Sequence, residues 1–311
     1  MRDDILDRII HWAKKQKDIR LLILEGSKAT KKHTDIYSDY DINVYSNDYS
    51  KHLKSVRWIK HISNILIYQK EQFHSSGSII PTRLVVFKNG QKVDFSFWKL
   101  ELISEMIKSR KYYKSYHAGF NILLDKDNLS DKMKVELSDP FKISRPSKDH
   151  FLQTIHDFWF EAYCVSKYLK RSDLWLAKSI ENGPLKNLLL RMFLWHTVLD
   201  SDGHFSTELH IGGKRLEKWL HPNIQKHISQ CFSRYNINET WRSLFSSLSL
   251  FGNLARIVSK RLKIDYPSVK EQEILHFLMK IKSIKTLKPI DPSPIPGLRA
   301  GLRNRKDSRH E

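Results

Sequence analysis

The Asn89-Gly90 pair constrains the fold of this chain more than any other local feature. It lies between two runs rich in apolar residues, within the segment TRLVVFKNGQKVDFSFW. Asn-Gly between such runs is the strongest short-range signal for a β-hairpin, because a type I′ turn requires positive φ at both central residues. We therefore predict two paired antiparallel strands, over residues 82–88 and 92–97.

The rest of the first 140 residues has the pattern of a mixed α+β unit. Apolar residues recur at helical spacing in some segments, and short apolar runs in others are typical of strands. The predicted helices cover residues 1–16, 50–61 and 99–109. Besides the hairpin, the predicted strands cover residues 20–26, 41–46, 65–69 and 121–124. The sequence thus predicts a mixed sheet with helices.

The sequence pattern changes after residue 145, where helix-type periodicity continues and glycine and proline become sparse. The predicted helices cover residues 149–170, 172–182, 184–200, 213–220, 239–262 and 269–284. A linker with Pro140 and Pro146 separates the two parts. We predict an α+β domain over residues 1–140, an all-α domain over 149–285, and a basic tail over 286–311 that lacks apolar periodicity and is expected to be disordered.

Composition narrows the classes of partner. The 311-residue chain has a formal net charge of +20, which favours a polyanionic partner such as a nucleotide, nucleic acid or an acidic membrane surface. The basic residues are spread along the chain, so nucleic acid is possible but not expected. Cys164 and Cys231 are the only cysteines, which excludes a disulfide framework and a cysteine-based metal site. The sequence has neither a signal peptide nor a run of 18 apolar residues, so we expect a cytoplasmic protein, a monomer or a dimer, without a membrane span.

Three aspartates are expected to converge on one face of the sheet. Asp39 and Asp41 flank the start of one predicted strand, and Asp94 lies on the second strand of the hairpin. Side chains alternate along a strand, so Asp39 and Asp41 share a face. Two like charges ~4 Å apart repel by about 4 kcal/mol at an effective dielectric constant of ~20. A divalent cation with hard oxygen ligands, such as Mg²⁺, would neutralise this cluster.

Gly26 and Ser27 follow a predicted buried strand directly. A glycine lets the backbone approach a phosphate closely, and the amides and hydroxyl that follow can donate hydrogen bonds to phosphate oxygens. Lys28 is a candidate to neutralise further phosphate charge. Gly-Ser or Asp-x-Asp alone is common by chance. The order of buried strand, Gly-Ser, Asp-x-Asp and a later hairpin aspartate is the informative signal.

Taken together, these motifs resemble those of the polymerase-beta-type nucleotidyltransferase superfamily. Within it, the chain resembles the aminoglycoside (streptomycin) 6-adenylyltransferase family over about residues 1–285. In the first part the resemblance rests on LEGSKATKKHTDIYSDYDINVYSND, KVDFSF and NILLDKD. In the helical part it rests on FWFEAYCVSKYLKRSDLWLAKSI, LLLRMFLWHTVL, GGKRLEKWL and LFGNLARIVSKRLKIDYP. Lys28 departs from the family pattern, which usually has arginine after Gly-Ser.

The resemblance implies an enzyme that transfers AMP from ATP to a hydroxyl of an aminoglycoside such as streptomycin, with Mg²⁺, and releases pyrophosphate. It implies that Asp39 and Asp41 bind metal, and that Asp94 shares a metal and could take the hydroxyl proton. Gly26 and Ser27 match the phosphate loop. One alternative, prompted by the basic charge, is transfer to a protein or nucleic-acid hydroxyl. A protein that only senses nucleotides is disfavoured, because it has no physical need for three clustered carboxylates.

Three residues of the helical part are further candidates. Asp157 and Glu161 are four apart on a predicted helix, so they share a face and could bind a substrate ammonium. Ordinary surface ion pairs are the simpler interpretation of both. Lys178 lies on an otherwise apolar turn and could reach the triphosphate of ATP, although extension of its ammonium to solvent fits equally well.

Overall fold

The computed structural model describes residues 4–32, 34–75, 77–139, 143–200 and 211–284. By its contacts the chain divides into two compact units, Met1–Phe141 and Lys142–Glu311. The predicted tail, 286–311, lies outside the described residues. Among the described helices, none combines the length and the apolar character needed to cross a bilayer.

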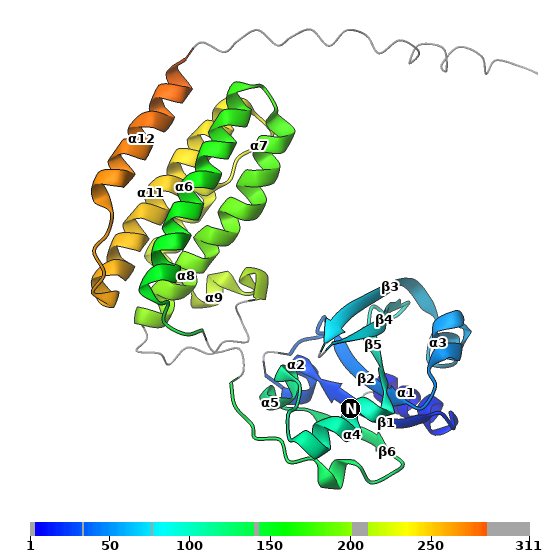
Figure 1. Cartoon of the computed structure of the whole chain (residues 1–311). Coiled ribbons are helices and arrows are strands. Elements are labelled where there is room, and N and C mark those ends of the chain that lie inside the picture. Colours follow the sequence, from blue (N-terminus) through cyan, green and yellow to red (C-terminus); the bar gives the residue numbers. More distant parts are fainter. Residues whose placement is uncertain (1–3, 33, 76, 140–142, 201–210, 285–311) are drawn as a thin grey trace, which may run out of the picture. The chain divides into compact units, whose positions relative to one another are not determined.

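The first unit is built on a mixed sheet, as predicted. Its described strands are β1 Ile19–Glu25, β2 Tyr40–Ser46, β3 Ile65–Ser75, β4 Ser78–Phe87, β5 Lys92–Lys99 and β6 Asn121–Asp125. Their order across the sheet is β3-β4-β5-β2-β1-β6, so β3 and β6 form opposite edges (Figure 1). The pair β2 and β5 is parallel, and the other neighbours are antiparallel.

Alternation of side chains gives the sheet two apolar faces. One face carries Leu22, Ile42 and Phe95, and it packs against helix α1 Asp4–Lys14 and the 3₁₀ helix η1 Arg57–His61. The opposite face carries Leu21, Ile23, Tyr45 and Trp98. It packs against α4 Leu100–Ser109 and α5 Lys114–Ala118. The short helices α2 Gly26–Thr30 and α3 Ser50–Lys54 and the 3₁₀ turn η2 Ser130–Lys132 complete the described elements of this unit.

The predicted hairpin is present, but its turn differs from the prediction. The amide of Gly90 donates to the carbonyl of Phe87 at 2.9 Å, and the amide of Phe87 donates to the carbonyl of Gln91 at 2.9 Å. The loop therefore has three residues, 88–90, and only Gly90 has positive φ (+83°). A type I turn followed by a left-handed glycine closes such a loop, so Asn89 does not need the left-handed conformation of a type I′ turn.

Other helices and strands of the first unit have bounds that differ from the predicted ones. The predicted helix 50–61 is instead α3 followed by η1. Strand β3 continues to Ser75, beyond the predicted end at residue 69. This extension is an edge strand exposed on both faces, so it lacks the apolar alternation by which a strand is recognised in a sequence. Helix α5 was not predicted, because it has only five residues.

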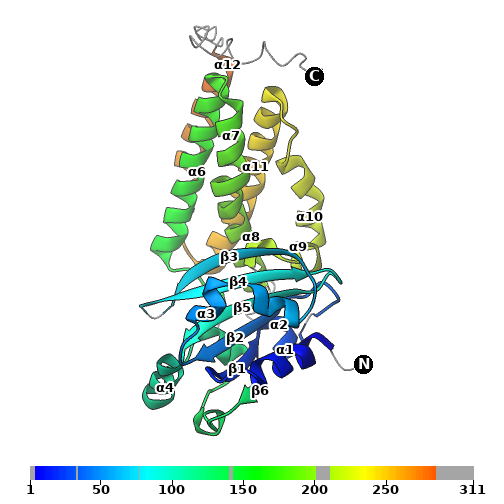
Figure 2. The same cartoon turned by 90° about the vertical axis from the view of Figure 1, so that its right-hand side faces the viewer.

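The described part of the second unit is entirely helical, as predicted. Its α-helices are α6 Lys148–Lys170, α7 Leu174–Ile180, α8 Lys186–Asp200, α9 Leu216–Trp219, α10 Pro222–Ile228, α11 Ile237–Leu262 and α12 Ser268–Ser283. The long helices α6 and α11 lie side by side (Figure 1, Figure 2). Two 3₁₀ turns, η5 Ile211–Gly213 and η6 Ser229–Cys231, flank the short helices. Helix α10, which begins at Pro222, was not predicted.

The predicted break at Gly183-Pro184 is also absent. A π-helical turn, η3 Glu181–Leu185, joins α7 to α8 in one continuous helical run. Proline lacks an amide proton and its ring crowds the preceding turn of an α-helix, so a wider turn can accommodate it. The dipeptide therefore marks a change of helical pitch and not the end of a helix.

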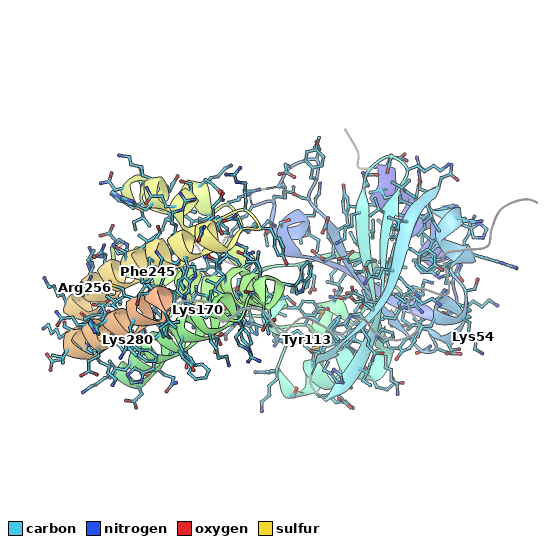
Figure 3. All side chains as sticks on the ribbon, turned by 90° about the horizontal axis from the view of Figure 1, so that it is seen from above. Lys54, Tyr113, Lys170, Phe245, Arg256 and Lys280 are labelled. Atoms are coloured by element: carbon cyan, nitrogen blue, oxygen red, sulfur yellow. The ribbon has the colours of Figure 1, made fainter. Side chains whose placement is uncertain are left out.

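The second unit has a large buried apolar core and an ion pair that links α12 to α11. In its core the ring of Phe158 on α6 stacks on that of Phe251 on α11, with centroids 3.7 Å apart. Glu271 on helix α12 pairs through its carboxylate with Arg256 of α11 and accepts a hydrogen bond from Tyr266 Oη at 2.8 Å. Figure 3 labels Arg256 on its helix. Gly252 provides the space for this carboxylate, because a Cβ there would lie 2.2 Å from Glu271 Oε1.

Candidate active site

Three carboxylates form a row across the centre of the sheet in the first unit. Glu25 is opposite Asp41 in the ladder between β1 and β2, and Asp41 is opposite Asp94 in the ladder between β2 and β5. Residues directly opposite each other point to the same face of a sheet. The predicted convergence of Asp41 and Asp94 is therefore present. Glu25 was missed, although period-two alternation along β1 places it with Leu21 and Ile23 on this face.

Asp39 joins the row through a lysine that the sequence analysis did not single out. Lys92 Nζ lies 2.7 Å from Asp39 Oδ2 and 2.9 Å from Asp94 Oδ2. Asp39 directly precedes β2, and Lys92 is the first residue of β5. The sequence Lys92-Val93-Asp94 could have indicated this lysine, since residues two apart on a strand point to the same face.

The row contains more negative charge than the described residues neutralise. Burial is the largest cause that raises the pKa of the Asp41 carboxyl to about 7. The neighbouring carboxylates raise it further, in the order Glu25, Asp94 and Asp39, while Lys92 lowers it. Burial also raises the pKa of Asp94, against the effect of Lys92. Asp94 Oδ1 is buried and has no hydrogen-bond partner among the described residues.

A buried polar network fixes one end of this row. Ser115 Oγ on α5 donates to Glu25 Oε2 at 2.8 Å. Next to it, Asn43 Nδ2 donates to Tyr116 Oη at 3.1 Å, and the hydroxyls of Tyr116 and Tyr45 are 2.6 Å apart. Burial raises the pKa of Glu25 and raises the pKa values of both tyrosines well above their ordinary value. The network thus connects β1, β2 and α5 directly behind Asp41.

Gly26 connects the Gly-Ser motif to the carboxylate row. Its φ is +73°, and a Cβ at this position would lie 2.3 Å from Asp41 Oδ2. Both facts require glycine here. Ser27 and Lys28 lie on the first turn of α2, and Lys28 Nζ is 4.7 Å from the ring centre of Tyr40 and 3.2 Å from the carbonyl oxygen of Asp35. Phosphate binding by Gly26, Ser27 and Lys28 stays a prediction.

The three remaining candidates belong to the second unit. Asp157 on α6 accepts a hydrogen bond from Gln153 Nε2 at 2.7 Å. Glu161 forms no hydrogen bond or ion pair with the described residues, and burial, followed by the charge of Asp157, raises its pKa. Lys178 is buried, 2.6 Å from Glu181 Oε2 and 2.9 Å from Ser233 Oγ. It would have to leave Glu181 to reach a triphosphate, and the assigned roles of all three residues stay predictions.

The donor set of the first unit fits a hard divalent cation. No group of three or more His, Cys, Asp or Glu side chains in the described residues is already arranged to hold a metal. Lys92 forms an ion pair with each of Asp39 and Asp94. Asp94 Oδ1 nevertheless has no partner, and Asp41 is flanked by carboxylates. Oxygen ligands of this type suit Mg²⁺.

Comparison with known proteins gives matches over most of the chain. The profile of the streptomycin adenylyltransferase family matches residues 1–281. An aminoglycoside 6-adenylyltransferase of Bacillus subtilis (strain 168) is 25% identical, over 86% of this chain and 93% of that protein. An aminoglycoside 6-adenylyltransferase of Campylobacter jejuni is 24% identical, over 90% of this chain and 95% of that protein. A crystal structure of an aminoglycoside 6-adenyltransferase from Bacillus subtilis aligns with a TM-score of 0.45 and 22% identity, over 91% of this chain and 100% of that one.

Proposed function

Because this chain belongs to the streptomycin adenylyltransferase family, as its motifs predicted, we propose that it transfers AMP from ATP to a hydroxyl of streptomycin or a similar aminoglycoside. It is a nucleotidyltransferase, and the two relatives described above are named as aminoglycoside 6-adenylyltransferases. The observation that carries the proposal is the alignment of Asp41 with Asp94 in the β2–β5 ladder, with Asp39 next to it, in a chain matched to the family over residues 1–281.

In the proposed reaction, an acceptor hydroxyl oxygen forms a bond to the α-phosphorus of ATP. The bond from that phosphorus to the bridging oxygen breaks, and pyrophosphate leaves with the electron pair. Asp39, Asp41 and Asp94 would hold Mg²⁺, which when bound supplies positive charge at the phosphates. We assign Asp94 as the acceptor of the hydroxyl proton, because its Oδ1 is buried without a partner. Gly26 keeps the backbone clear of Asp41.

The acceptor must be recognised by local acidic groups, because an aminoglycoside and this chain are both cationic. We propose Asp157 and Glu161 for an ammonium of the acceptor. Glu161 supports this, since its half-buried carboxylate has no cationic partner among the described residues. A bound ammonium would lower the pKa of Glu161 and offset the repulsion from Asp157.

The test is release of pyrophosphate from ATP and Mg²⁺, with and without streptomycin. The wild type is compared with Asp41→Asn and with Asp131→Asn, a control at an exposed aspartate of the same unit. We expect streptomycin-dependent release in the wild type and the control, and its loss in Asp41→Asn. Release that depends instead on added RNA or protein would reject the aminoglycoside and support the alternative acceptors.

A further inference from the structure

Lys92 is the one cation that forms an ion pair with the aspartates of the candidate site in the described part of the chain. We propose that Lys92 is an internal cation that occupies the place of the divalent ion while the protein is free of metal. Its ammonium holds Asp39 and Asp94 together, and it withdraws when the metal binds. Lys92 is thus a positioning residue. The inference rests on one part of the proposed function, namely that Asp39 and Asp94 are metal ligands.

The sheet itself determines this arrangement. Tyr40 is opposite Val93 in the parallel ladder. Asp39, which directly precedes β2, and Lys92, the first residue of β5, therefore lie next to each other. Asp94 follows two positions after Lys92 on the same face of β5. The ammonium reaches Oδ2 of both aspartates at 2.7 and 2.9 Å, within the range of charge-assisted hydrogen bonds.

The side chain also has a route out of the site. The side chain of Lys92 is 34% exposed, whereas that of Asp94 is 21% exposed. A lysine ammonium is a compact charge on a flexible four-carbon stem, so it can move to solvent or to a phosphate oxygen without movement of the strand. An arginine would hold the two carboxylates in a planar, bidentate geometry and would be harder to displace.

Displacement by metal has a functional consequence. A divalent ion that enters the metal-free site must first break two charge-assisted hydrogen bonds, so metal binding without nucleotide is weakened. When ATP binds as well, its phosphates offer the released ammonium new partners. Lys92 therefore makes metal binding favourable mainly in the presence of the nucleotide.

The experiment is a titration of the purified full chain with Mn²⁺ in the absence of ATP, followed by electron paramagnetic resonance of the free ion. We expect Lys92→Met to bind Mn²⁺ about tenfold more tightly than the wild type, which is at the low end for loss of a close charge partner. Lys92→Arg should bind no more tightly than the wild type. Lys88→Met, at an exposed lysine of the same hairpin, should match the wild type.

A thermal measurement separates this role from simple packing. In EDTA, Lys92→Met should melt below the wild type because Asp39 and Asp94 then repel each other, and Mg²⁺ should restore most of the loss. A purely structural lysine would give a loss that Mg²⁺ does not restore. Equal or weaker Mn²⁺ binding by Lys92→Met, including no binding by either protein, would overturn the inference.

The Mn²⁺ titration tests the role of Lys92 independently of which acceptor the enzyme uses. If Lys92→Met binds Mn²⁺ more tightly but no aminoglycoside supports pyrophosphate release, the inference stands and the proposed acceptor fails. If streptomycin supports release but Mn²⁺ affinity is unchanged in Lys92→Met, the function stands and the inference fails.

Discussion

The carboxyl of Asp41 has a carboxylate on each side of it, from Glu25 on β1 and Asp94 on β5. Burial, followed by the charges of these neighbours, makes the charge of Asp41 unfavourable in the folded, metal-free protein and raises its pKa from an ordinary 3.8 to about 7. A group whose pKa is raised by folding contributes stability that is present below the unfolded pKa and lost as pH rises through the folded value. The contribution of Asp41 to the stability of the metal-free protein should therefore be lost as the pH rises from about 4 to about 7.

Asp41→Asn tests this pH dependence. In EDTA at pH 8, we expect the variant to melt at least about 3 °C above the wild type, because a neutral amide replaces a disfavoured charge. At pH 4 the two should melt together, since Asp41 is then protonated. Scanning calorimetry at both pH values measures the difference. A constant gap at both pH values would reject the assigned pKa shift, and Asp131→Asn is the matched control.

Gly26 provides a second test on the scale of single residues. Gly26→Ala adds backbone strain of about 1–2 kcal/mol at positive φ and also drives a methyl group into Asp41. We expect pyrophosphate release to fall about 100-fold, the typical cost of misplacing a catalytic group. Gly77→Ala is the control, because Gly77 has nearly the same φ (+76°) and no atom within 4 Å of an added Cβ. It should share the loss of stability and keep the activity; equal activity losses would show that strain alone is responsible.

Individual residues of the site were only partly predictable from the sequence. Asp41 and Asp94 could be found because the start of one strand and the Asn-Gly hairpin indicated to which face of the sheet each side chain points. Glu25 and Lys92 were not found, because each becomes a candidate only when strand pairing places it next to an aspartate of the site. Pairing between β1 and β2, and between β2 and β5, is information about the whole sheet that local periodicity does not contain.

At the scale of secondary structure, the buried central strands were predictable, whereas the exposed part of β3 was not. The strands β1, β2 and β5 are buried on the sheet's faces, and their apolar runs marked them correctly. Strand β3 has the mostly polar sequence KEQFHS beyond residue 69, where the predicted strand ended. The π-turn η3 was missed because Gly-Pro normally ends a helix, whereas packing of α7 and α8 in one run overrides that preference.

The attachment of α12 to α11 gives a prediction about an element. Glu271→Gln weakens the pair with Arg256 and the hydrogen bond from Tyr266, and we expect a loss of about 1–3 kcal/mol in the free energy of unfolding. Glu273→Gln is the matched control two residues along the same helix, where the Lys270–Glu273 pair is exposed and should contribute less than ~0.5 kcal/mol. Urea unfolding followed by circular dichroism measures both. Similar losses would mean that α12 is held by apolar contacts alone.

At the scale of the whole molecule, the family match ends at residue 281, just before the end of α12. We therefore expect a chain that ends at residue 284 to keep its melting temperature and to release pyrophosphate within about twofold of the full chain. The comparison is best made at several salt concentrations, because the removed segment is basic. A larger, salt-dependent loss of activity would show that these residues assist binding of the anionic nucleotide.

The parallel ladder between β2 and β5 has a consequence for the evolution of the gene. The chain leaves the sheet centre after Ser46 and returns at Lys92, and the β3–β4 hairpin lies between these points. The alignment of Asp41 with Asp94 depends on the ladder and not on the length of that excursion. Codons can therefore be gained or lost at the hairpin tip, near Ser75 and Ser78, without loss of the row of carboxylates. A single-codon insertion within β2, by contrast, would turn Asp41 away from its neighbours in one step.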